Sequence, residues 1–373
     1  CLAFESYGKK QSYNAPVSQE AAFRYGTALN ELLNGPNRER HRLYLADGTV
    51  LFWTGKPSPL EAELAAFLSG NTDASAEDEG KSQDDATLGN IRVVLRALRE
   101  GSGVLSVLGE DPETPFYVLG LSPNAGRISV RIWHRDTLGG FVERLRRHYE
   151  ALDIVRPSFG KEFPTIRMLL RETALQGKDE NVAPLLGGAL MRSILTGAPY
   201  PDTLATAIIR RIRADHDDKQ HPNRQINYLR AAILKAWLLR SPRWHGEIPV
   251  SLDTNRPEPA YRLGRLFAAL EKTQEEALPG INATIRDRYY GAVSATPGSV
   301  VPRLLRTYQH HLSNLSPGGK VTREKLVQEI VGGIGDIPRT LSLEEQGLFA
   351  IGYYHQRQNF FTPKGEDSPD TFS

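Results

Sequence analysis

Residues 116–134, FYVLGLSPNAGRISVRIWH, constrain the fold of this chain more than any other stretch. Residues 116–121 form an almost unbroken apolar run and residues 128–134 alternate, which predicts two paired strands. The residues between them, SPNAG, suit a turn, because Pro fixes φ while Asn and Gly tolerate positive φ. The first half of the chain therefore contains an antiparallel hairpin.

The second strand of this hairpin carries two arginines close to an aromatic residue. A period of two places one set of side chains on the face that we expect to be core: Ile128, Val130 and Ile132. The opposite face then carries Arg127, Ser129, Arg131 and Trp133. Two guanidinium groups beside an indole suit a phosphate or a base, and they equally suit a carboxylate on a neighbouring element. Arg127 and Arg131 are therefore candidate nucleic-acid contacts, with a structural role as the alternative.

Strand and helix signals divide the chain into two parts. Residues 42–45 and 50–54 flank Asp47 and Gly48, a dipeptide typical of a tight hairpin, and Ser18 is placed to cap the helix that follows it. After the central hairpin no convincing strand follows. Gly- and Pro-rich gaps separate candidate helices at about 138–152, 164–175, 181–195, 202–215, 224–239, 257–278, 281–293, 299–312, 322–331 and 342–358. We predict an α+β N-terminal part with antiparallel hairpins, followed by an all-α C-terminal helical bundle.

The chain is long enough for two or three domains, with 373 residues. The Pro-rich stretch IPVSLDTNRPEP at 248–259 is the best internal boundary, because the helices that follow it are numerous enough to form their own bundle. We therefore predict an α+β domain at 1–150, a basic helical region at 151–249 and a helical bundle at 250–373.

Charge is unevenly distributed along a chain whose net charge is only +2. Residues 135–249 hold 19 basic and 13 acidic side chains, a net charge of +6, while residues 250–373 hold 14 of each. Residues 69–87 contain six acids and one lysine, which predicts a solvated surface loop, with mimicry of nucleic acid or contact with a basic partner as the alternative. No apolar run approaches the roughly 20 residues of a membrane span, so we expect a cytoplasmic protein.

Motifs for catalysis are missing from the sequence. It has no GxxxxGK[ST] loop, no GxGxxG after a strand, no GxSxG elbow and no HExxH helix, and the single Cys1 cannot form an internal disulfide. His216 and Asp217, with His221 nearby, are the types that a metal-dependent phosphohydrolase or nuclease needs. No spacing singles out further ligands, so we read this cluster as a polar helix end. The prediction is a non-enzymatic protein without metal or cofactor, and a nuclease is the alternative.

The basic helices are the most informative part of the middle region. Their cations are Arg210, Arg211 and Arg213 on one helix and Arg230, Lys235, Arg240 and Arg243 on and after the next. Tyr228, Trp237 and Trp244 lie between them in sequence. Clustered cations neutralise phosphates, and aromatic rings support unstacked bases. We therefore predict that these seven residues contact nucleic acid, with a core role for the aromatics and a solvated face for the charges as the alternative.

Several motifs in order resemble one known family. They are SYGK at 6–9, NAPVS at 14–18, ALN at 28–30, VLFW at 50–53 and, above all, LGLSPNAGRISVR at 119–131. Together they resemble the large subunit of the type I-C CRISPR surveillance complex (Cascade), from the first residue into the C-terminal helices.

The resemblance implies a non-enzymatic subunit of an RNA-guided complex that binds target double-stranded DNA. Such a subunit supports recognition of the motif flanking the target, assists strand separation, holds the displaced strand and recruits a helicase-nuclease in trans. Its partners would include the guide RNA-bound backbone subunits. In such complexes, base pairing with the guide RNA recognises the target sequence. This fits a protein that has phosphate-binding charge and no group of catalytic residues. A purely structural scaffold is a further alternative.

The resemblance also makes two predictions about chain boundaries. The family has an N-terminal region before the position of Cys1, and the strand-like start of this sequence agrees with a longer polypeptide. The family's C-terminal helices resemble a small subunit that is also made by internal translation. Because Met168 and Met191 lie well upstream, we predict initiation near Val250. The mass of a small co-purifying species tests this: a mass that fits a start at either methionine would contradict it.

Overall fold

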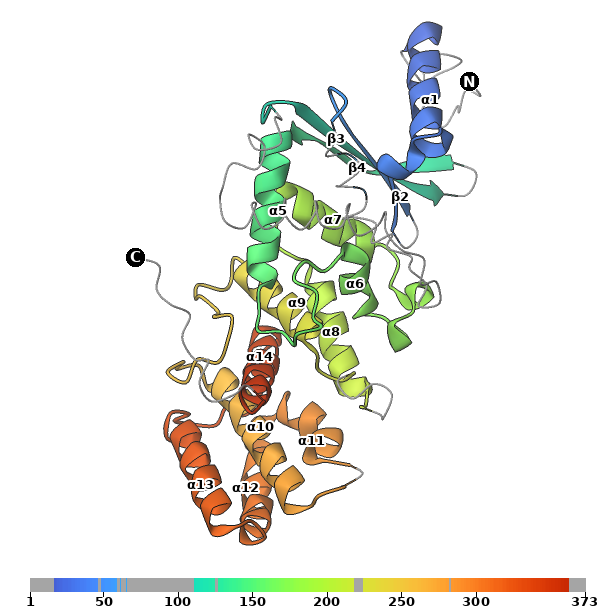
Figure 1. The fold of residues 1–373 in the computed structure, drawn as a ribbon. Helices are drawn as coiled ribbons and strands as arrows, with labels where there is room; N and C mark the ends of the chain where they lie inside the picture. Colours follow the sequence, from blue (N-terminus) through green and yellow to red (C-terminus); the bar gives the residue numbers. More distant parts are fainter. Residues whose placement is uncertain are drawn as a thin grey trace. The chain divides into compact units, whose positions relative to one another are not determined.

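The computed structural model describes residues 17–45, 48–58, 61, 65, 111–124, 127–217, 224–281 and 283–361 (Figure 1). The chain forms two compact units. The first contains residues 1–97 and 101–141, and the second contains residues 98–100 and 142–373. The second is helical, so the predicted fold class, α+β followed by helices, is confirmed. The predictions for the acidic stretch 69–87, and the N-terminal motif at 6–9, lie outside the described residues.

The first unit is built on a four-stranded antiparallel sheet. Its strands are β1 (Arg42–Leu45), β2 (Gly48–Thr54), β3 (Pro115–Asn124) and β4 (Arg127–Thr137), in the spatial order β1-β2-β3-β4. Both predicted hairpins are confirmed, since β1 pairs with β2 and β3 with β4. Helix α1 (Gln19–Asn34) begins at Ser18, whose hydroxyl accepts a hydrogen bond from the Ala21 amide at 3.1 Å, as its sequence predicts.

One face of the sheet is the core of this unit. Phe52, Phe116, Val118 and Ile132 are buried on it. The Phe116 ring packs 4.4 Å from the ring of Phe141, measured between centroids, at the start of α5 (Leu138–Leu152). Burial alternates along β3 from Phe116 to Gly120, as expected for a strand with one covered face.

The predicted core face of β4 is wrong for two of its three residues. Ile132 is buried, but Ile128 and Val130 are each 62% exposed. The cause is a β-bulge: Gly120 pairs with Ile132 and Leu121 with Val130, so Arg131 is the extra residue that the bulge inserts into β4. The extra residue reverses the alternation, which moves Val130 and Ile128 to the face that carries Trp133.

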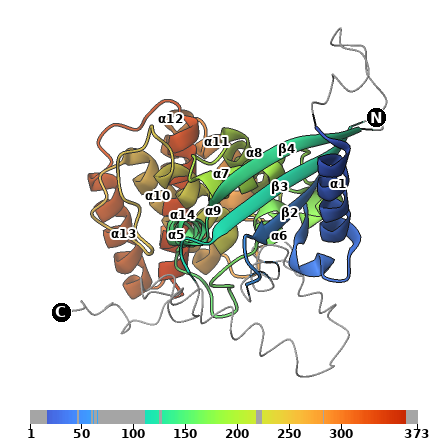
Figure 2. The ribbon, with the colours of Figure 1, turned by 90° about the horizontal axis from the view of Figure 1, so that it is seen from above.

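The second unit is a bundle in which two long helices cross closely. Its helices are α6 (Ile166–Arg171), α7 (Leu186–Thr196), α8 (Asp202–Ala214), α9 (Tyr228–Leu239), α10 (Pro259–Ala277), α11 (Ile285–Val293), α12 (Pro297–Ser313), α13 (Pro317–Gly332) and α14 (Leu343–Asn359), together with most of α5. The last of these, α14, packs on both α10 and α9 (Figures 1 and 2). All ten predicted helices are therefore present.

Helix α14 connects residues 151–249 with residues 250–373, the two regions on either side of the predicted boundary. The Tyr354 hydroxyl donates a hydrogen bond to the Val155 carbonyl at 2.7 Å, and the Val155 amide donates to the Val250 carbonyl at 2.7 Å. These regions belong to the same compact unit. The predicted domain boundary and the separate product starting near Val250 stay predictions.

Substituting Gly264 with alanine should destabilise the helical unit by about 3 kcal/mol, the upper end of typical overpacking costs. A Cβ atom on Gly264 would lie 2.0 Å from the Phe349 carbonyl oxygen, and one on Gly352 would lie 2.2 Å from the Tyr261 carbonyl oxygen. Backbone atoms cannot rotate away as side chains can, so α10 and α14 would have to separate. Urea unfolding followed by circular dichroism at 222 nm measures the loss.

The matched control for this substitution is Gly188→Ala in α7. Apart from its chain neighbours and the nearby backbone of its own helix, no atom lies within 4 Å of a Cβ at Gly188. Alanine there therefore removes only the helix penalty of glycine and should stabilise by roughly 0.5–1 kcal/mol. Equal unfolding midpoints for the two variants would show that the helices do not cross in contact.

Candidate nucleic-acid interface

The three predicted cations of α8 have different surroundings. Arg211 forms an ion pair with Asp215 one turn later. Arg213 is half-buried and donates from Nη2 to the Gln346 side-chain oxygen at 2.9 Å, and burial lowers its pKa. Arg210 is exposed and has no ion-pair partner among the residues that the structure describes. Of these three, Arg210 has the surroundings that a contact with phosphate requires.

Arg230 lies at the centre of a buried ion cluster. Its side chain is 4% exposed, with Nε 2.9 Å from Glu172 Oε2 and Nη2 2.6 Å from Asp215 Oδ2. Burial raises the pKa of Asp215, but the hydrogen bonds from Arg211 and Arg230 outweigh burial, so the pKa lies below its ordinary value. The charge of Arg230 is therefore balanced inside the protein, and its role toward nucleic acid stays a prediction.

Lys235 and Arg240 bind backbone carbonyl groups. The Lys235 ammonium is buried and donates to the Asp153 carbonyl, and burial lowers its pKa to about 8. Arg240 Nη2 donates to the carbonyls of Ser193 at 2.6 Å and Ala198 at 2.8 Å. Both cations join α9 to neighbouring segments. These internal hydrogen bonds account for the positions of the two side chains without any ligand.

The remaining predicted residue of this region, Arg243, is exposed and forms ion pairs with Asp202 at 2.9 Å and Glu344 at 2.8 Å. The interleaved Trp237 is a core residue, 1% exposed, and its indole N–H donates to Asp202 at 3.0 Å. Trp237 thus follows the core alternative and is closed to a base. In the first unit, Arg127 and Arg131 are exposed on β4, with Arg131 at the bulge.

His216 and Asp217 do not converge on a common point. Asp217 forms an ion pair with Arg286 at 2.7 Å and accepts a hydrogen bond from the Gln225 amide at 2.8 Å. Burial raises the pKa of Asp217. The His216 side chain is 62% exposed, and its Nδ1 lies 3.6 Å from Asp287. The described residues contain no group of three or more His, Cys, Asp or Glu that could hold a metal ion, and His221 lies outside them.

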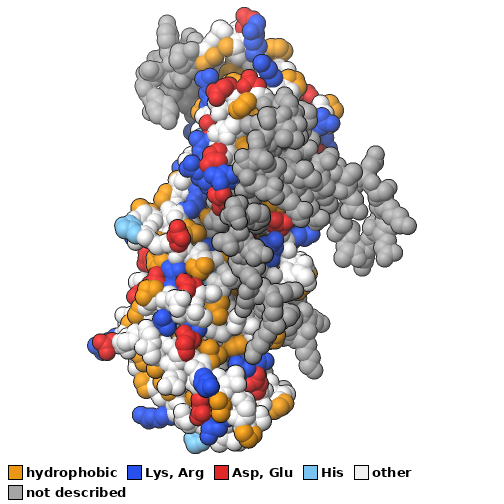
Figure 3. Space-filling model, turned by 60° about the vertical axis from the view of Figure 1, so that its left-hand side comes forward, with side chains coloured by type: hydrophobic (Ala, Val, Ile, Leu, Met, Phe, Trp, Pro, Cys, Tyr) orange, Lys and Arg blue, Asp and Glu red, His pale blue; other side chains and the backbone are white. Residues whose placement is uncertain are grey.

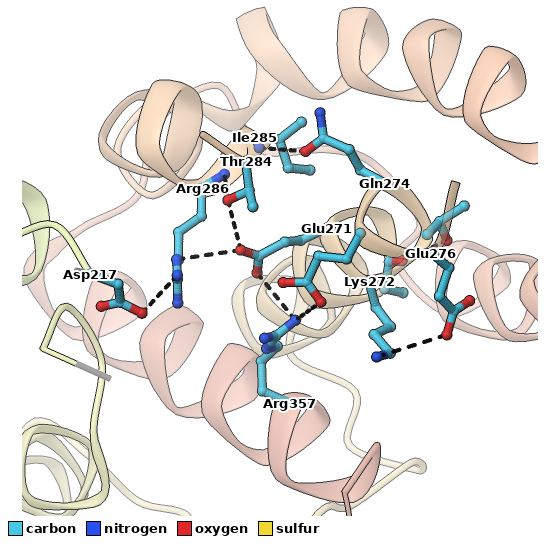
Figure 4. A network of polar contacts seen from close by, with 12 residues as sticks. Asp217, Glu271, Lys272, Gln274, Glu276, Thr284, Ile285, Arg286 and Arg357 are labelled. Carbon is cyan, nitrogen blue, oxygen red and sulfur yellow. Dashed lines mark hydrogen bonds and ion pairs between the residues drawn. The ribbon is translucent and has the colours of Figure 1, made fainter. Parts of the chain in front are cut away.

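Asp217 belongs to a network centred on Glu271 of α10 (Figure 4). The fully buried Glu271 carboxylate lies 3.3 Å from Arg286 and 3.8 Å from Arg357, and it accepts hydrogen bonds from Thr284 at 2.9 Å and from the Tyr353 hydroxyl. Its partners come from the start of α11 and from α14. The network therefore links three helices that are distant in sequence.

A cavity of about 770 Å³ lies beside this network within the helical unit. Its arginines are Arg171, Arg224, Arg230, Arg286 and Arg357, and its rings are Phe159, Tyr228, Tyr353, Tyr354 and Phe361. Arg171 forms an ion pair with Asp179, Arg230 with Glu172, Arg286 with Asp217, and Arg357 with Glu275. These pairs leave the cavity wall close to neutral, which does not favour an anion.

Acidic and basic side chains also lie interspersed over the face of the protein seen in Figure 3. Cations without ion-pair partners are therefore the informative ones. Besides Arg210, the described residues include Arg288 on α11 and Arg303 and Arg306 on α12, which are exposed and without an ion pair there. Helix α12 contains no acidic residue. Its buried face carries Val301, Leu304, Tyr308 and Leu312, so both arginines lie on the opposite, solvent side.

Sequence reasoning missed Arg288, Arg303 and Arg306. Residues 250–373 have equal numbers of acids and bases, and this balance hid an acid-free helix. The available signal was the spacing of Arg303, Arg306 and His310, which places three basic side chains on one helical face. The Arg303 guanidinium also lies 5.7 Å from the ring centre of Tyr289, which joins the surfaces of α11 and α12.

Comparison with known proteins gives a family. The described residues include no helix that is long and apolar enough to span a membrane. No curated protein matches the chain. One family model, described as CRISPR-associated protein (Cas_Csd1), matches residues 2–361, nearly the whole chain. The protein with the four-stranded sheet and the helical bundle described above therefore belongs to the Csd1 family of CRISPR-associated proteins.

Proposed function

We propose that this chain is the non-catalytic large subunit of a type I-C, RNA-guided surveillance complex. It binds target double-stranded DNA, supports recognition of the flanking motif and strand separation, and holds the displaced strand. It assembles with guide RNA-bound backbone subunits and recruits a helicase-nuclease that cuts. Membership of a CRISPR-associated family and the order of the sequence motifs support this proposal.

The observation that carries DNA binding is the acid-free outer face of α12. Arg303 and Arg306 face solvent one turn apart and have no ion-pair partner among the described residues, so neither has to break an ion pair to bind a phosphate. Arginine suits phosphate because its planar group donates two parallel hydrogen bonds. Arg210 and Arg288 are further exposed cations of the same helical unit.

Reversing both charges on α12, Arg303→Glu with Arg306→Glu, should flatten the salt dependence of duplex binding by the assembled complex. Each lost phosphate contact lowers the slope of log affinity against log salt by about 0.9, so two contacts lower it by about 1.8. The ratio of affinities between 50 and 200 mM salt should then fall by roughly tenfold. Filter binding or electrophoretic mobility shift over this range measures the slope.

The control is Lys320→Glu with Lys325→Glu on α13, a helix that, unlike α12, also carries two acids, Glu324 and Glu329. This double variant changes the net charge equally and should keep the wild-type slope. An unchanged slope for the α12 variant would overturn DNA binding at α12. Loss of assembly with retained duplex affinity would instead favour a structural scaffold.

A nuclease based on His216 remains the catalytic competitor. Because His216 is exposed, His216→Ala should leave folding intact. We expect purified chain to leave DNA uncut in Mg²⁺ or Mn²⁺. Cleavage that survives purification and disappears in His216→Ala would contradict the non-catalytic proposal.

A further inference from the structure

We infer that the open face of the β-sheet binds single-stranded DNA by stacking bases on an aromatic cluster. The cluster is Trp53 on β2, Tyr117 on β3 and Trp133 on β4. The ring centroids of Trp53 and Tyr117 are 5.4 Å apart, those of Tyr117 and Trp133 are 6.2 Å apart, and those of Trp53 and Trp133 are 6.1 Å apart. This inference rests on the proposed function and names the surface and the form of DNA.

Strand register places all three rings opposite the core. Trp53 pairs with Tyr117, and Trp133 pairs with Leu119, two residues from Tyr117 on the same face of β3. The buried face carries the alternating residues of β3, Phe116 and Val118. The cluster therefore lies on the side opposite Phe116 and Val118. This side is covered at Leu51 and Leu121, which are buried, and accessible at Trp133, which is 60% exposed.

The β-bulge enlarges this open face. By reversing the alternation of β4 it adds Val130 and Ile128, each 62% exposed, to the side of Trp133. Tyr44 on β1 is 66% exposed and belongs to the same face, since its partner Thr49 pairs with Leu121. A surface with this much exposed aromatic and aliphatic area indicates a binding site.

Charge on this face identifies the partner. Arg135, whose strand partner is Tyr117, lies with its guanidinium 5.8 Å from the centre of that ring. Arg42 lies 4.7 Å from the centre of the Tyr44 ring and forms an ion pair with Glu39 at 2.8 Å, so Arg135 is the cation of this face that carries the argument. The four strands contain one carboxylate, Asp136, which pairs with the buried Phe116 and so belongs to the core face. The strands thus offer cations and no acid on their open side.

Exposed rings on strands that carry an arginine and no acid on the same side fit single-stranded nucleic acid. Its unpaired bases expose flat faces that stack on aromatic side chains, while the phosphates meet the arginines. RNA-recognition motifs use this mode of binding, with RNA bases stacked on aromatic residues of a four-stranded sheet. A duplex keeps its base faces stacked inside, so it gains little from the cluster. In the proposed function, unpaired DNA is supplied by strand separation.

Trp133→Ala should weaken binding of single-stranded DNA by between about fivefold and a hundredfold, the range for loss of one base–aromatic stack. Trp133→Phe should keep most of the affinity because a flat ring remains. Fluorescence anisotropy of a labelled thymidine oligonucleotide, with the full chain and with the assembled complex, measures both. Crosslinking of an iodouracil-containing strand should label Trp133 itself.

Phe159→Ala is the matched control, because Phe159 is a 77% exposed aromatic residue of the helical unit and its removal should not affect single-strand affinity. Equal single-strand affinity of Trp133→Ala and wild type would overturn the inference, as would tighter, Trp133-dependent binding of RNA or loss of assembly in the variant. Duplex affinity and its salt slope should be unchanged in Trp133→Ala. Failure of this inference is therefore distinguishable from failure of the proposed function, which the α12 variant tests.

Discussion

Replacing Glu271 with alanine is expected to lower the free energy of unfolding of the helical unit by about 3–5 kcal/mol, the cost of removing one partner from a buried ion pair. The carboxylate is fully buried among Arg286, Arg357, Thr284 and Tyr353. Without it, two guanidinium groups lose a shared counter-charge and the Tyr353 hydroxyl loses its acceptor. At the surface, water would compensate for these lost contacts. In the buried network, the groups left without a partner carry the full free-energy cost of desolvation.

Urea unfolding followed by circular dichroism at 222 nm measures this change, because helices of the second unit dominate that signal. Glu324→Ala on the exposed side of α13 is the control and should change stability by less than about 0.5 kcal/mol. Glu271→Gln should fall between the two, since the amide oxygen still accepts hydrogen bonds. If Glu271→Ala and Glu324→Ala unfold at the same urea concentration, the network does not hold the three helices together.

Acidification from pH 7 to pH 5 is expected to remove about 4 kcal/mol of stability through two buried histidines. His148 is bonded to the Tyr200 hydroxyl, and burial, with a smaller effect of the Arg240 charge, lowers its pKa to about 3. His355 Nδ1 lies 2.9 Å from the Tyr261 hydroxyl, and burial, followed by the charges of nearby cations, lowers its pKa to about 3.

Because both pKa values are depressed in the folded state, the unfolded chain takes up a proton at each histidine first. The contribution of these histidines is fully present above the unfolded pKa of about 6.5 and is lost as the pH falls toward 3, by about 1.4 kcal/mol per histidine and pH unit. Unfolding titrations at pH 7, 6 and 5 give this slope.

The slope of stability against pH gives the number of protons taken up on unfolding, and this number identifies the histidines that titrate. In His355→Asn, which keeps a polar atom near Nδ1, the slope between pH 6 and pH 5 should fall from about two protons to about one. Stability that does not vary between pH 7 and pH 5 would show that the two histidines are not buried as neutral rings.

Local chemistry was enough to predict the elements of this fold. Asp47 and Gly48 predict the first hairpin, and the SPNAG turn predicts the second. The helix predicted at 202–215 is α8, Asp202–Ala214, and the one predicted at 138–152 has the bounds of α5. These signals act between residues a few positions apart, where periodicity and turn propensity are decisive.

The candidate site was less predictable, because it depends on which charges are paired. Arg230 is neutralised by Glu172, 58 residues away in sequence, and Arg213 bonds to Gln346, 133 residues away. Nothing near these arginines in sequence distinguishes them from the exposed Arg210. Arg303 and Arg306 were overlooked for the converse reason, since the acids that balance their region in composition do not lie on α12.

By itself the sequence determined the order and type of the elements, the two hairpins and the resemblance to a CRISPR-associated family. Only the tertiary structure decided which arginines are internal counter-ions, which face of β4 is open, and where Gly264 and Gly352 let two helices touch. The physical reason is that secondary structure follows from local backbone and side-chain preferences. Burial and ion pairing depend instead on residues that meet only when the chain has folded.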